Sequence, residues 1–189
     1  MAVMKAVHPR VSFAEMERWP EDGRRYELYD GEVFEIPSPI PLHQMVSARL
    51  YLALQAYVSA HGGIVLYAPL DIVLTEYDVV QPDLVLFTRE RQHLIDPKKV
   101  TRKPPDLAVE ILSPGTESND RGRKLRLLAR HGVREYWIVD AEEARIEVYR
   151  LAGDLFALAH TADRADGIQS PLLPGLQLHP NDLLPTVEH

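Results

Sequence analysis

One short stretch decides the fold: residues 105–115 read PDLAVEILSPG. The run Asp106 to Leu112 is almost entirely apolar, which is typical of a central strand buried on both faces of a sheet. The turn residues Ser113-Pro114-Gly115 follow it. Within the run, Glu110 stands where a packed core would prefer an aliphatic side chain. Because an unpartnered buried carboxylate costs roughly several kcal/mol, we expect a cation, a basic side chain or a raised pKa to compensate it. A purely structural ion pair is the alternative.

The chain before this strand alternates between helical and extended patterns. Ser12 and Glu15 have the spacing of a capping box, and Asp30-Gly31 is a strong hairpin signal. Apolar residues at steps of three and four predict a long helix that stops at Gly62-Gly63. We therefore expect a helix at 13–18, a hairpin over 25–36, a helix at 42–60, and strands at 64–68, 71–75 and 84–88.

The chain after this strand continues the alternation. Leu125 and Leu128 have helical spacing, and Gly132 ends that segment. We expect a helix at 119–131, a strand at 134–140, a hairpin of 144–151 with 155–159, and a last turn capped by Asn181. This order predicts a single α/β domain over 1–189, ordered from about 10 to 185. It would have one central mixed sheet flanked by helices, an N-terminal hairpin and a peripheral C-terminal hairpin.

Composition narrows the classes of protein. Hydrophobic residues make up 46% and charged residues 26% of the 189, as in ordinary globular domains. No apolar run approaches the roughly 20 residues that span a bilayer, and residues 1–10 lack the apolar core of a secretory signal. We expect a soluble, cytoplasmic protein without a membrane partner. The absence of cysteine excludes disulfides and thiolate metal sites, which leaves oxygen and imidazole ligands.

The charges are unevenly distributed along the chain. The net charge of −7 argues mildly against a surface that binds nucleic acid everywhere. A local basic patch nevertheless falls within the helix predicted at 119–131, where Asp120 is the single acid. Arg121 and Arg123 in this patch are candidate DNA contacts, although a solvated helix face is the blander interpretation.

Two carboxylates on neighbouring predicted strands suggest a metal site. Asp83 follows Pro82 at the start of an apolar strand, a position that alone would indicate turn chemistry. Together with Glu110 it offers the one or two carboxylates with which proteins bind Mg²⁺ or Mn²⁺, whose other ligands are water and substrate phosphate. Lys124, on the helix that follows the Glu110 strand, could reach back to a bound phosphate or an attacking water. Its alternative is a solvated pair with Asp120 at i,i+4.

Several blocks of the sequence together resemble the Uma-type family of proposed bacterial endonucleases, formerly a domain of unknown function. They are YELYDGE at 26–32, PDLV at 82–85, PDLAVEILSP at 105–114, DRGRK at 120–124 and GVREYWIVD at 132–140. The resemblance covers most of the chain. It implies the restriction-endonuclease-like PD-(D/E)XK fold.

The resemblance also implies roles for particular residues. Asp83 and Glu110 would bind the metal, and the lysine of the motif would have moved from position 112 to Lys124. Glu27 would join the acidic cluster, and His43 would be a further substrate-binding position, although a lone histidine there is more often a cap. The sequence departs from the family at Leu128, where a tyrosine is usual.

These observations predict a Mg²⁺- or Mn²⁺-dependent endonuclease that hydrolyses DNA phosphodiester bonds and forms a homodimer. Two alternatives stay open: a non-catalytic binding protein with the same fold, and a hydrolase of small phosphoesters, which would suit the acidic net charge.

Overall fold

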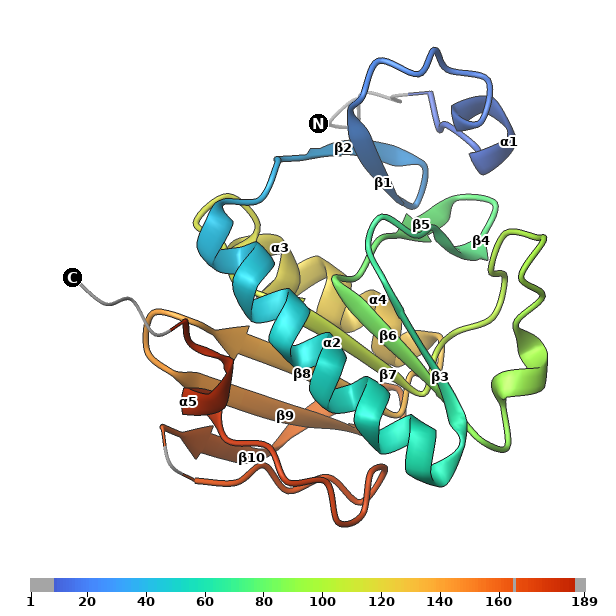
Figure 1. Ribbon diagram of the computed structural model, residues 1–189. Coiled ribbons are helices and arrows are strands. Elements are labelled where there is room, and N and C mark those ends of the chain that lie inside the picture. Colours follow the sequence, from blue (N-terminus) through green and yellow to red (C-terminus); the bar gives the residue numbers. More distant parts are fainter. Residues whose placement is uncertain (1–8, 165, 186–189) are drawn as a thin grey trace, which may run out of the picture.

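The structure, a computed structural model, describes residues 9–164 and 166–185, so most of the N-terminal segment discussed above lies outside the described residues. Its centre is a six-stranded sheet with the order β10-β9-β8-β7-β6-β3 (Figure 1). The strands are β3 (Gly63–Tyr67), β6 (Leu84–Thr88), β7 (Leu107–Ile111), β8 (Glu135–Asp140), β9 (Arg145–Ala152) and β10 (Leu155–Asp163). The decisive stretch supplies β7, which lies in the middle of the sheet.

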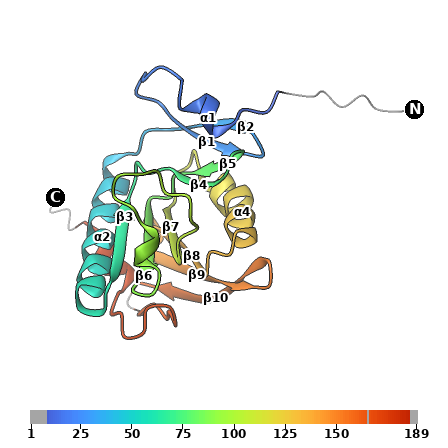
Figure 2. The same cartoon turned by 90° about the vertical axis from the view of Figure 1, so that its right-hand side faces the viewer.

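Only β7 and β8 run parallel in this sheet, and the chain between them crosses over one face. This crossover comprises α3 (Glu117–Asn119), a π-helical turn (Asp120–Lys124) and α4 (Leu125–Arg130). The opposite face is covered by α2 (Pro41–His61). Figure 2 shows α2 and α4 on opposite sides of the sheet. Side chains of β7 alternate between two cores, with Val109 on the α2 side and Ala108 on the α4 side.

A second, four-stranded sheet lies above one end of the first, in the order β2-β1-β5-β4. Its strands are β1 (Arg25–Tyr29), β2 (Glu32–Ile36), β4 (Ile72–Thr75) and β5 (Asp78–Val80). Asp30 and Gly31 both have positive φ, at 52° and 79°, as the tight β1–β2 turn requires. The short helix α1 (Phe13–Met16) buries Phe13 against this sheet.

The predicted α/β architecture, with a central mixed sheet and flanking helices, is confirmed, but the single sheet is wrong. The strand predicted at 71–75 belongs to the small sheet, where it pairs with β5, which the sequence analysis missed. The helix predicted at 119–131 is present over 117–130, and residues 120–124 within it form a π-helical turn. The helix predicted at 13–18 ends at Met16.

The C-terminal part also departs from the prediction in detail. The hairpin β9–β10 is longer than expected and forms one edge of the main sheet instead of a separate element. Helix α5 (Pro180–Leu183) begins before Asn181, so its cap is His179. Among the described residues, no helix combines the length and apolar character needed to cross a membrane.

Candidate active site

The side chain of Glu110 lies on the α4 side of β7. It shares this face with Ala108, because alternate residues of a strand point the same way, and it is 4% exposed. The crossover from β7 to β8 passes over this face, so its helical segment covers Glu110. This topology brings Lys124 to Glu110 although they lie on different elements.

Lys124 ends the π-helical turn and points inward. Its Nζ lies 2.8 Å from Glu27 Oε1, 2.9 Å from Glu110 Oε1 and 3.5 Å from Asp120 Oδ1. Only 4% of Lys124 is exposed, so the alternative of a solvated pair with Asp120 is wrong, although Asp120 does contact it. The buried ion pair with Glu110, the structural alternative for that residue, is present.

Glu27 lies on β1 of the small sheet and contacts Lys124 at 2.8 Å. Its Oε1 also accepts a hydrogen bond from the backbone N–H of Gln81 at 2.8 Å. Its Oε2 accepts from the Tyr29 hydroxyl at 2.7 Å, and Asn119 Nδ2 lies 3.4 Å away. Both carboxylate oxygens are thus occupied by protein donors, which fits a residue that positions Lys124.

Asp83 precedes β6 and reaches the neighbouring strand β7. Its Oδ2 accepts the backbone N–H of Ile111 at 2.8 Å and lies 3.0 Å from His43 Nε2. These contacts hold Asp83 beside the end of β7 that carries Glu110. His43 lies in the first turn of α2, and its buried Nδ1 has no protein partner.

The cluster holds more negative than positive charge. Three carboxylates, those of Glu27, Glu110 and Asp120, contact the ammonium of Lys124, and a fourth, that of Asp83, lies nearby and pairs with His43. Burial raises the pKa of Glu110 well above its usual value, and the neighbouring carboxylates add to this against the effect of Lys124. Burial likewise raises the pKa of Asp120, whose two oxygens lack a hydrogen-bond partner.

The same charge surplus acts on the ammonium. Burial alone would lower the pKa of Lys124, but the surrounding carboxylates outweigh it and hold that pKa well above its usual value. Lys124 therefore stays protonated in the fold. The cluster as a whole has more charge than its one cation neutralises.

A narrow pocket of about 30 Å³ opens onto this cluster. Asp83, Glu110, Lys124 and His43 line it, while Glu27 and Asp120 lie outside its lining. The remaining wall residues come from the β2–α2 connection, from the segments before β6 and after β7, and from β1: Ile36, Pro37, Pro39, Gln81, Ser113, Thr116 and Arg25. The two acids predicted as metal ligands thus face one recess together with the predicted lysine.

The predicted arginine contacts lie outside this lining. Arg121 donates to both oxygens of Glu147, at 2.7 and 3.2 Å, and to Glu117 at 2.9 Å. Arg123 lies 3.3 Å from Glu32, with its guanidinium 4.1 Å from the centre of the Phe34 ring. Leu128, at the position where the family usually has tyrosine, is fully buried in the core between the sheet and α4.

Several residues of the site were missed by sequence reasoning, and some left a signal. Tyr29 stands two residues after Glu27 and therefore shares its face of the strand. Asp120 precedes Lys124 by four residues, which places both on one side of a helix. Arg25 and Gln81 gave no comparable signal, because their positions in the pocket depend on how the two sheets meet.

The donor set fits a hard divalent cation. Asp83 and Glu110 offer carboxylate oxygens in one recess, and the surplus of buried negative charge favours a cation. Within residues 9–164 and 166–185, no group of three or more histidine, aspartate or glutamate side chains is arranged to hold a metal ion. Mg²⁺ commonly takes only one or two carboxylates and completes its octahedron with water and phosphate, so two such ligands suffice.

Comparisons with known proteins place the family and the fold of this chain. The family model Uma2, described as “Putative restriction endonuclease”, matches residues 13–181. A relative from Synechocystis, “Uncharacterized protein slr1290”, is 27% identical over 154 residues, which are 79% of this chain and 78% of the relative. The crystal structure of a “putative nuclease belonging to DUF820” from Anabaena variabilis superposes with a TM-score of 0.77. It is 20% identical and covers 92% of this chain and 97% of its own, a likeness that concerns the fold.

Proposed function

Because the chain belongs to the Uma2 family of “Putative restriction endonuclease” proteins, we propose that it is a metal-dependent nuclease that hydrolyses phosphodiester bonds of DNA. In this proposal Asp83 and Glu110 bind Mg²⁺ or Mn²⁺, and Lys124 acts on the scissile phosphate. The observation that carries the proposal is that Asp83 and Glu110 line one recess together with Lys124, which also contacts the buried carboxylates of Glu27 and Asp120.

The chain's own residues divide the work of such a site. Asp83 and Glu110 present oxygen ligands at the pocket, and His43 orients Asp83 through the 3.0 Å contact with Oδ2. Lys124 offers its ammonium to a phosphate oxygen or to the attacking water and stabilises negative charge in the transition state. Glu27 and Asp120 hold Lys124 from behind. A bound divalent cation would supply Lewis-acid polarisation of the phosphate and a water of lowered pKa.

The first test is cleavage of supercoiled plasmid and of single-stranded DNA by purified protein with Mg²⁺ or Mn²⁺. We expect products that disappear with EDTA and fall on the order of 10²-fold or more in Glu110→Gln, which removes one charged ligand. The matched control is Glu135→Gln, another buried glutamate of the same sheet, paired with Leu107 at the opposite end of β7. Cleavage that survives EDTA and Glu110→Gln would contradict the proposal.

A second test separates catalysis from metal binding. Lys124→Ala should reduce turnover more than it reduces affinity for Mg²⁺, measured by calorimetry at a temperature where circular dichroism shows the variant folded. Full metal-dependent cleavage by Lys124→Ala would remove Lys124 from the proposed machinery.

Two other functions have specific support. Lys124 already forms buried ion pairs with Glu27 and Glu110, as a non-catalytic binding protein that uses these acids only structurally would require. The net charge of −7 would suit a small phosphoester substrate better than long DNA. Salt dependence distinguishes them, because binding to a long duplex weakens steeply as salt rises, whereas turnover of a small substrate changes much less. The homodimer predicted from the sequence stays a prediction, which light scattering after gel filtration would test.

A further inference from the structure

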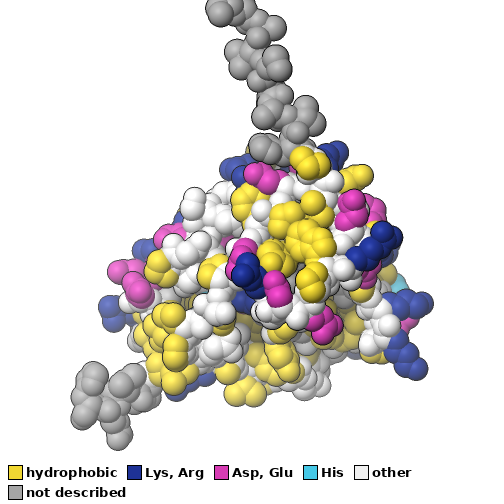
Figure 3. All heavy atoms as spheres, turned by 90° about the horizontal axis from the view of Figure 1, so that it is seen from above, with side chains coloured by type: hydrophobic (Ala, Val, Ile, Leu, Met, Phe, Trp, Pro, Cys, Tyr) yellow, Lys and Arg dark blue, Asp and Glu magenta, His cyan; other side chains and the backbone are white. Residues whose placement is uncertain are grey.

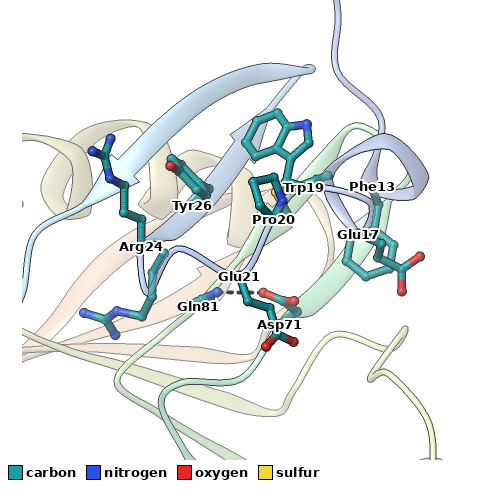
Figure 4. A pocket seen from close by; sticks show the side chains of 11 residues that line it. Phe13, Glu17, Trp19, Pro20, Glu21, Arg24, Tyr26, Asp71 and Gln81 are labelled. Atoms are coloured by element: carbon teal, nitrogen blue, oxygen red, sulfur yellow. Dashed lines mark hydrogen bonds between the residues drawn. The ribbon is translucent and has the colours of Figure 1, made fainter.

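A second cavity lies beside the catalytic pocket, between the α1–β1 connection and the small sheet. It has a volume of about 270 Å³, at the lower end of the roughly 300–1,000 Å³ typical of ligand sites. We call it the Trp19 groove and define it by Trp19, Pro20, Arg24, Tyr26, Asp71 and Gln81. Figure 4 shows Arg24 and Tyr26 on one side, Phe13 and Glu17 on the other, and Gln81 and Asp71 below Trp19 and Pro20.

The Trp19 groove and the catalytic pocket share part of their walls. Arg25 and Gln81 line both cavities. Gln81 is also tied to the catalytic cluster, since its backbone N–H donates to Glu27 at 2.8 Å. A ligand that occupies both cavities would therefore pass Arg25, whose guanidinium is suited to hold a phosphate between them.

The aromatic residues of the groove offer a stacking surface. Trp19, one of the two tryptophans in the chain, is 36% exposed. It meets Tyr26 edge to face, with ring centroids 5.1 Å apart and an interplanar angle of 89°. This geometry covers a ring face of only one partner. Nucleobases of any sequence stack on such exposed aromatic side chains.

The polar residues of the groove are suited to the edge of a base. Asp71 Oδ1 accepts a hydrogen bond from Gln81 Nε2 at 2.8 Å, so the two side chains are held together in the wall of the groove (Figure 4). Burial raises the pKa of Asp71, which means that a hydrogen-bond donor from a ligand would relieve its carboxylate. The exocyclic amines of cytosine and adenine are such donors. Arg24, on the other side, could contact the sugar-phosphate backbone.

The surroundings favour a flexible strand over a duplex. The catalytic pocket is small, at about 30 Å³, so a backbone must bend closely to reach it. Seen from above, the described side chains on this face are hydrophobic in the middle, with acidic and basic groups mixed around them (Figure 3). No continuous basic surface for a duplex backbone crosses the described part of this view.

We propose that the Trp19 groove binds an unpaired nucleotide next to the scissile phosphate, with the base on Trp19 and its phosphate at Arg25. The substrate is then single-stranded or locally unpaired DNA. The proposal deepens the nuclease function and rests on it for the scissile phosphate, but the binding it describes can be measured without cleavage.

The test uses the fluorescence of Trp19. The other tryptophan, Trp137, is fully buried in the core, so quenching by a ligand reports Trp19. The full chain is titrated with an oligodeoxyadenylate in EDTA, which prevents metal-dependent cleavage, and in parallel with a hairpin duplex of the same length. We expect the single strand to quench the emission and to bind more tightly than the duplex.

Substitutions then locate the contact. Trp19→Ala should weaken single-strand binding about 5- to 150-fold, measured by anisotropy of a labelled oligonucleotide, as expected for the loss of one stacked base. Trp19→Phe should keep most of the affinity and lose the quenching. The matched control is Tyr77→Ala, which removes an aromatic side chain of similar exposure, 38%, from outside the groove. Because Trp19 is part-exposed, its loss leaves the described core intact.

The outcomes separate the two proposals. If the wild type binds single strands and Trp19→Ala binds them equally well, or if the duplex binds as tightly as the single strand, the groove does not hold a base. Such a result leaves the nuclease proposal standing, since cleavage is assayed separately. Quenching and Trp19-dependent binding without any metal-dependent cleavage would instead support the groove and overturn the hydrolytic function.

Discussion

The two ends of β7 each bury a carboxylate, and they treat it in opposite ways. Asp106 precedes the strand and is fully buried, while Glu110 lies four residues further along and is 4% exposed. The two acids therefore have the same charge, lie on the same segment of the same sheet and are buried to a similar degree. The difference between them lies in the charges that each meets.

At the Asp106 end of β7, positive charge balances the buried carboxylate. Its Oδ2 accepts the backbone N–H and the hydroxyl of Thr88 at 2.8 and 3.0 Å. Its Oδ1 meets Arg91 at 2.8 Å and Arg134 at 3.3 Å. Both guanidinium groups are partly exposed, so water solvates their positive charge. This is the arrangement of a structural ion pair, because both buried oxygens of Asp106 have hydrogen-bond or charged partners.

At the Glu110 end of β7, the buried carboxylates outnumber the cation that they contact. Lys124 alone faces Glu27, Glu110 and Asp120 directly, and Asp83 lies beside them in the same cluster. A fold selected for stability alone would neutralise such a site or fill it with apolar groups. We infer that a surplus of buried charge, more than burial itself, distinguishes a functional acid from a structural one in this protein. The following predictions test that distinction.

The largest effect is expected at Lys124. Lys124→Met removes the one cation of the cluster and leaves three neighbouring acids buried without a partner. We expect the free energy of unfolding at pH 7 to fall by about 3–5 kcal/mol, as for other broken buried ion pairs. Urea unfolding followed by circular dichroism measures it.

A second substitution checks that charge, and not lost packing, causes this fall. Adding Glu110→Gln to Lys124→Met removes one of the stranded carboxylates, so the double variant should be more stable than Lys124→Met by roughly 0.5–3 kcal/mol. A double variant no more stable than the single one would show that the charge surplus is not the reason.

At the balanced end the expected effect is smaller. Asp106→Asn replaces one acceptor with an amide that must point a donor at Thr88 or at Arg91, and we expect a loss of roughly 1–3 kcal/mol. Metal-dependent cleavage per folded molecule should not change. If Asp106→Asn reduced cleavage as much as Glu110→Gln does, the two ends of β7 would not differ in function.

The sequence predicted one of these two ends and not the other, for a physical reason. Glu110 interrupts an apolar run, so its burial follows from the pattern of its own strand. Asp106 stands beside Pro105 at the start of that strand, where an acid is ordinary turn chemistry. Its partners Arg91 and Arg134 come from two other segments, and their approach depends on tertiary packing.

The same limit explains the errors in the fold. The long helix α2 and the strands β6 and β7 carry their own periodic signals and were predicted within one or two residues. The division into two sheets depends on which strand pairs with β5, a three-residue element too short to show a pattern. The π-helical turn likewise comes from the fit of Asp120 and Lys124 into the cluster, because helix propensity alone predicts a regular helix.

The pH dependence of stability should also differ at the unbalanced end. The pKa of Glu110 is raised in the fold, so the native state holds this proton more tightly than the unfolded chain. Its contribution to stability is complete below the unfolded pKa of about 4.3 and is lost as pH rises toward the folded value. The wild type should therefore lose stability relative to Glu110→Gln as pH rises above about 5, by at most about 1.4 kcal/mol per pH unit.

Thermal unfolding of both proteins at several pH values measures this difference, with and without Mg²⁺. A cation bound at Asp83 and Glu110 would offset the surplus charge, so Mg²⁺ should raise the midpoint of the wild type more than that of Glu110→Gln. Equal pH profiles of the two proteins would contradict the raised pKa, and equal responses to Mg²⁺ would contradict the metal site.

The smallest effects are expected on the outer face of the crossover, where two arginines repeat the comparison. Arg121 is held by Glu147 and Glu117, whereas Arg123 pairs with Glu32, which is largely exposed. Because solvent screens both pairs, Arg121→Ala should cost only about 0.5–1 kcal/mol of stability and Arg123→Ala less. If the arginine with fewer carboxylate partners is the one that contacts phosphate, Arg123→Ala should weaken DNA binding and reduce its dependence on salt by about one unit of slope, and Arg121→Ala should change neither. Binding titrations at several salt concentrations measure both effects. A larger salt effect from Arg121→Ala would mean that an arginine with two carboxylate partners still contacts phosphate. Charge balance would then not separate structural from functional residues.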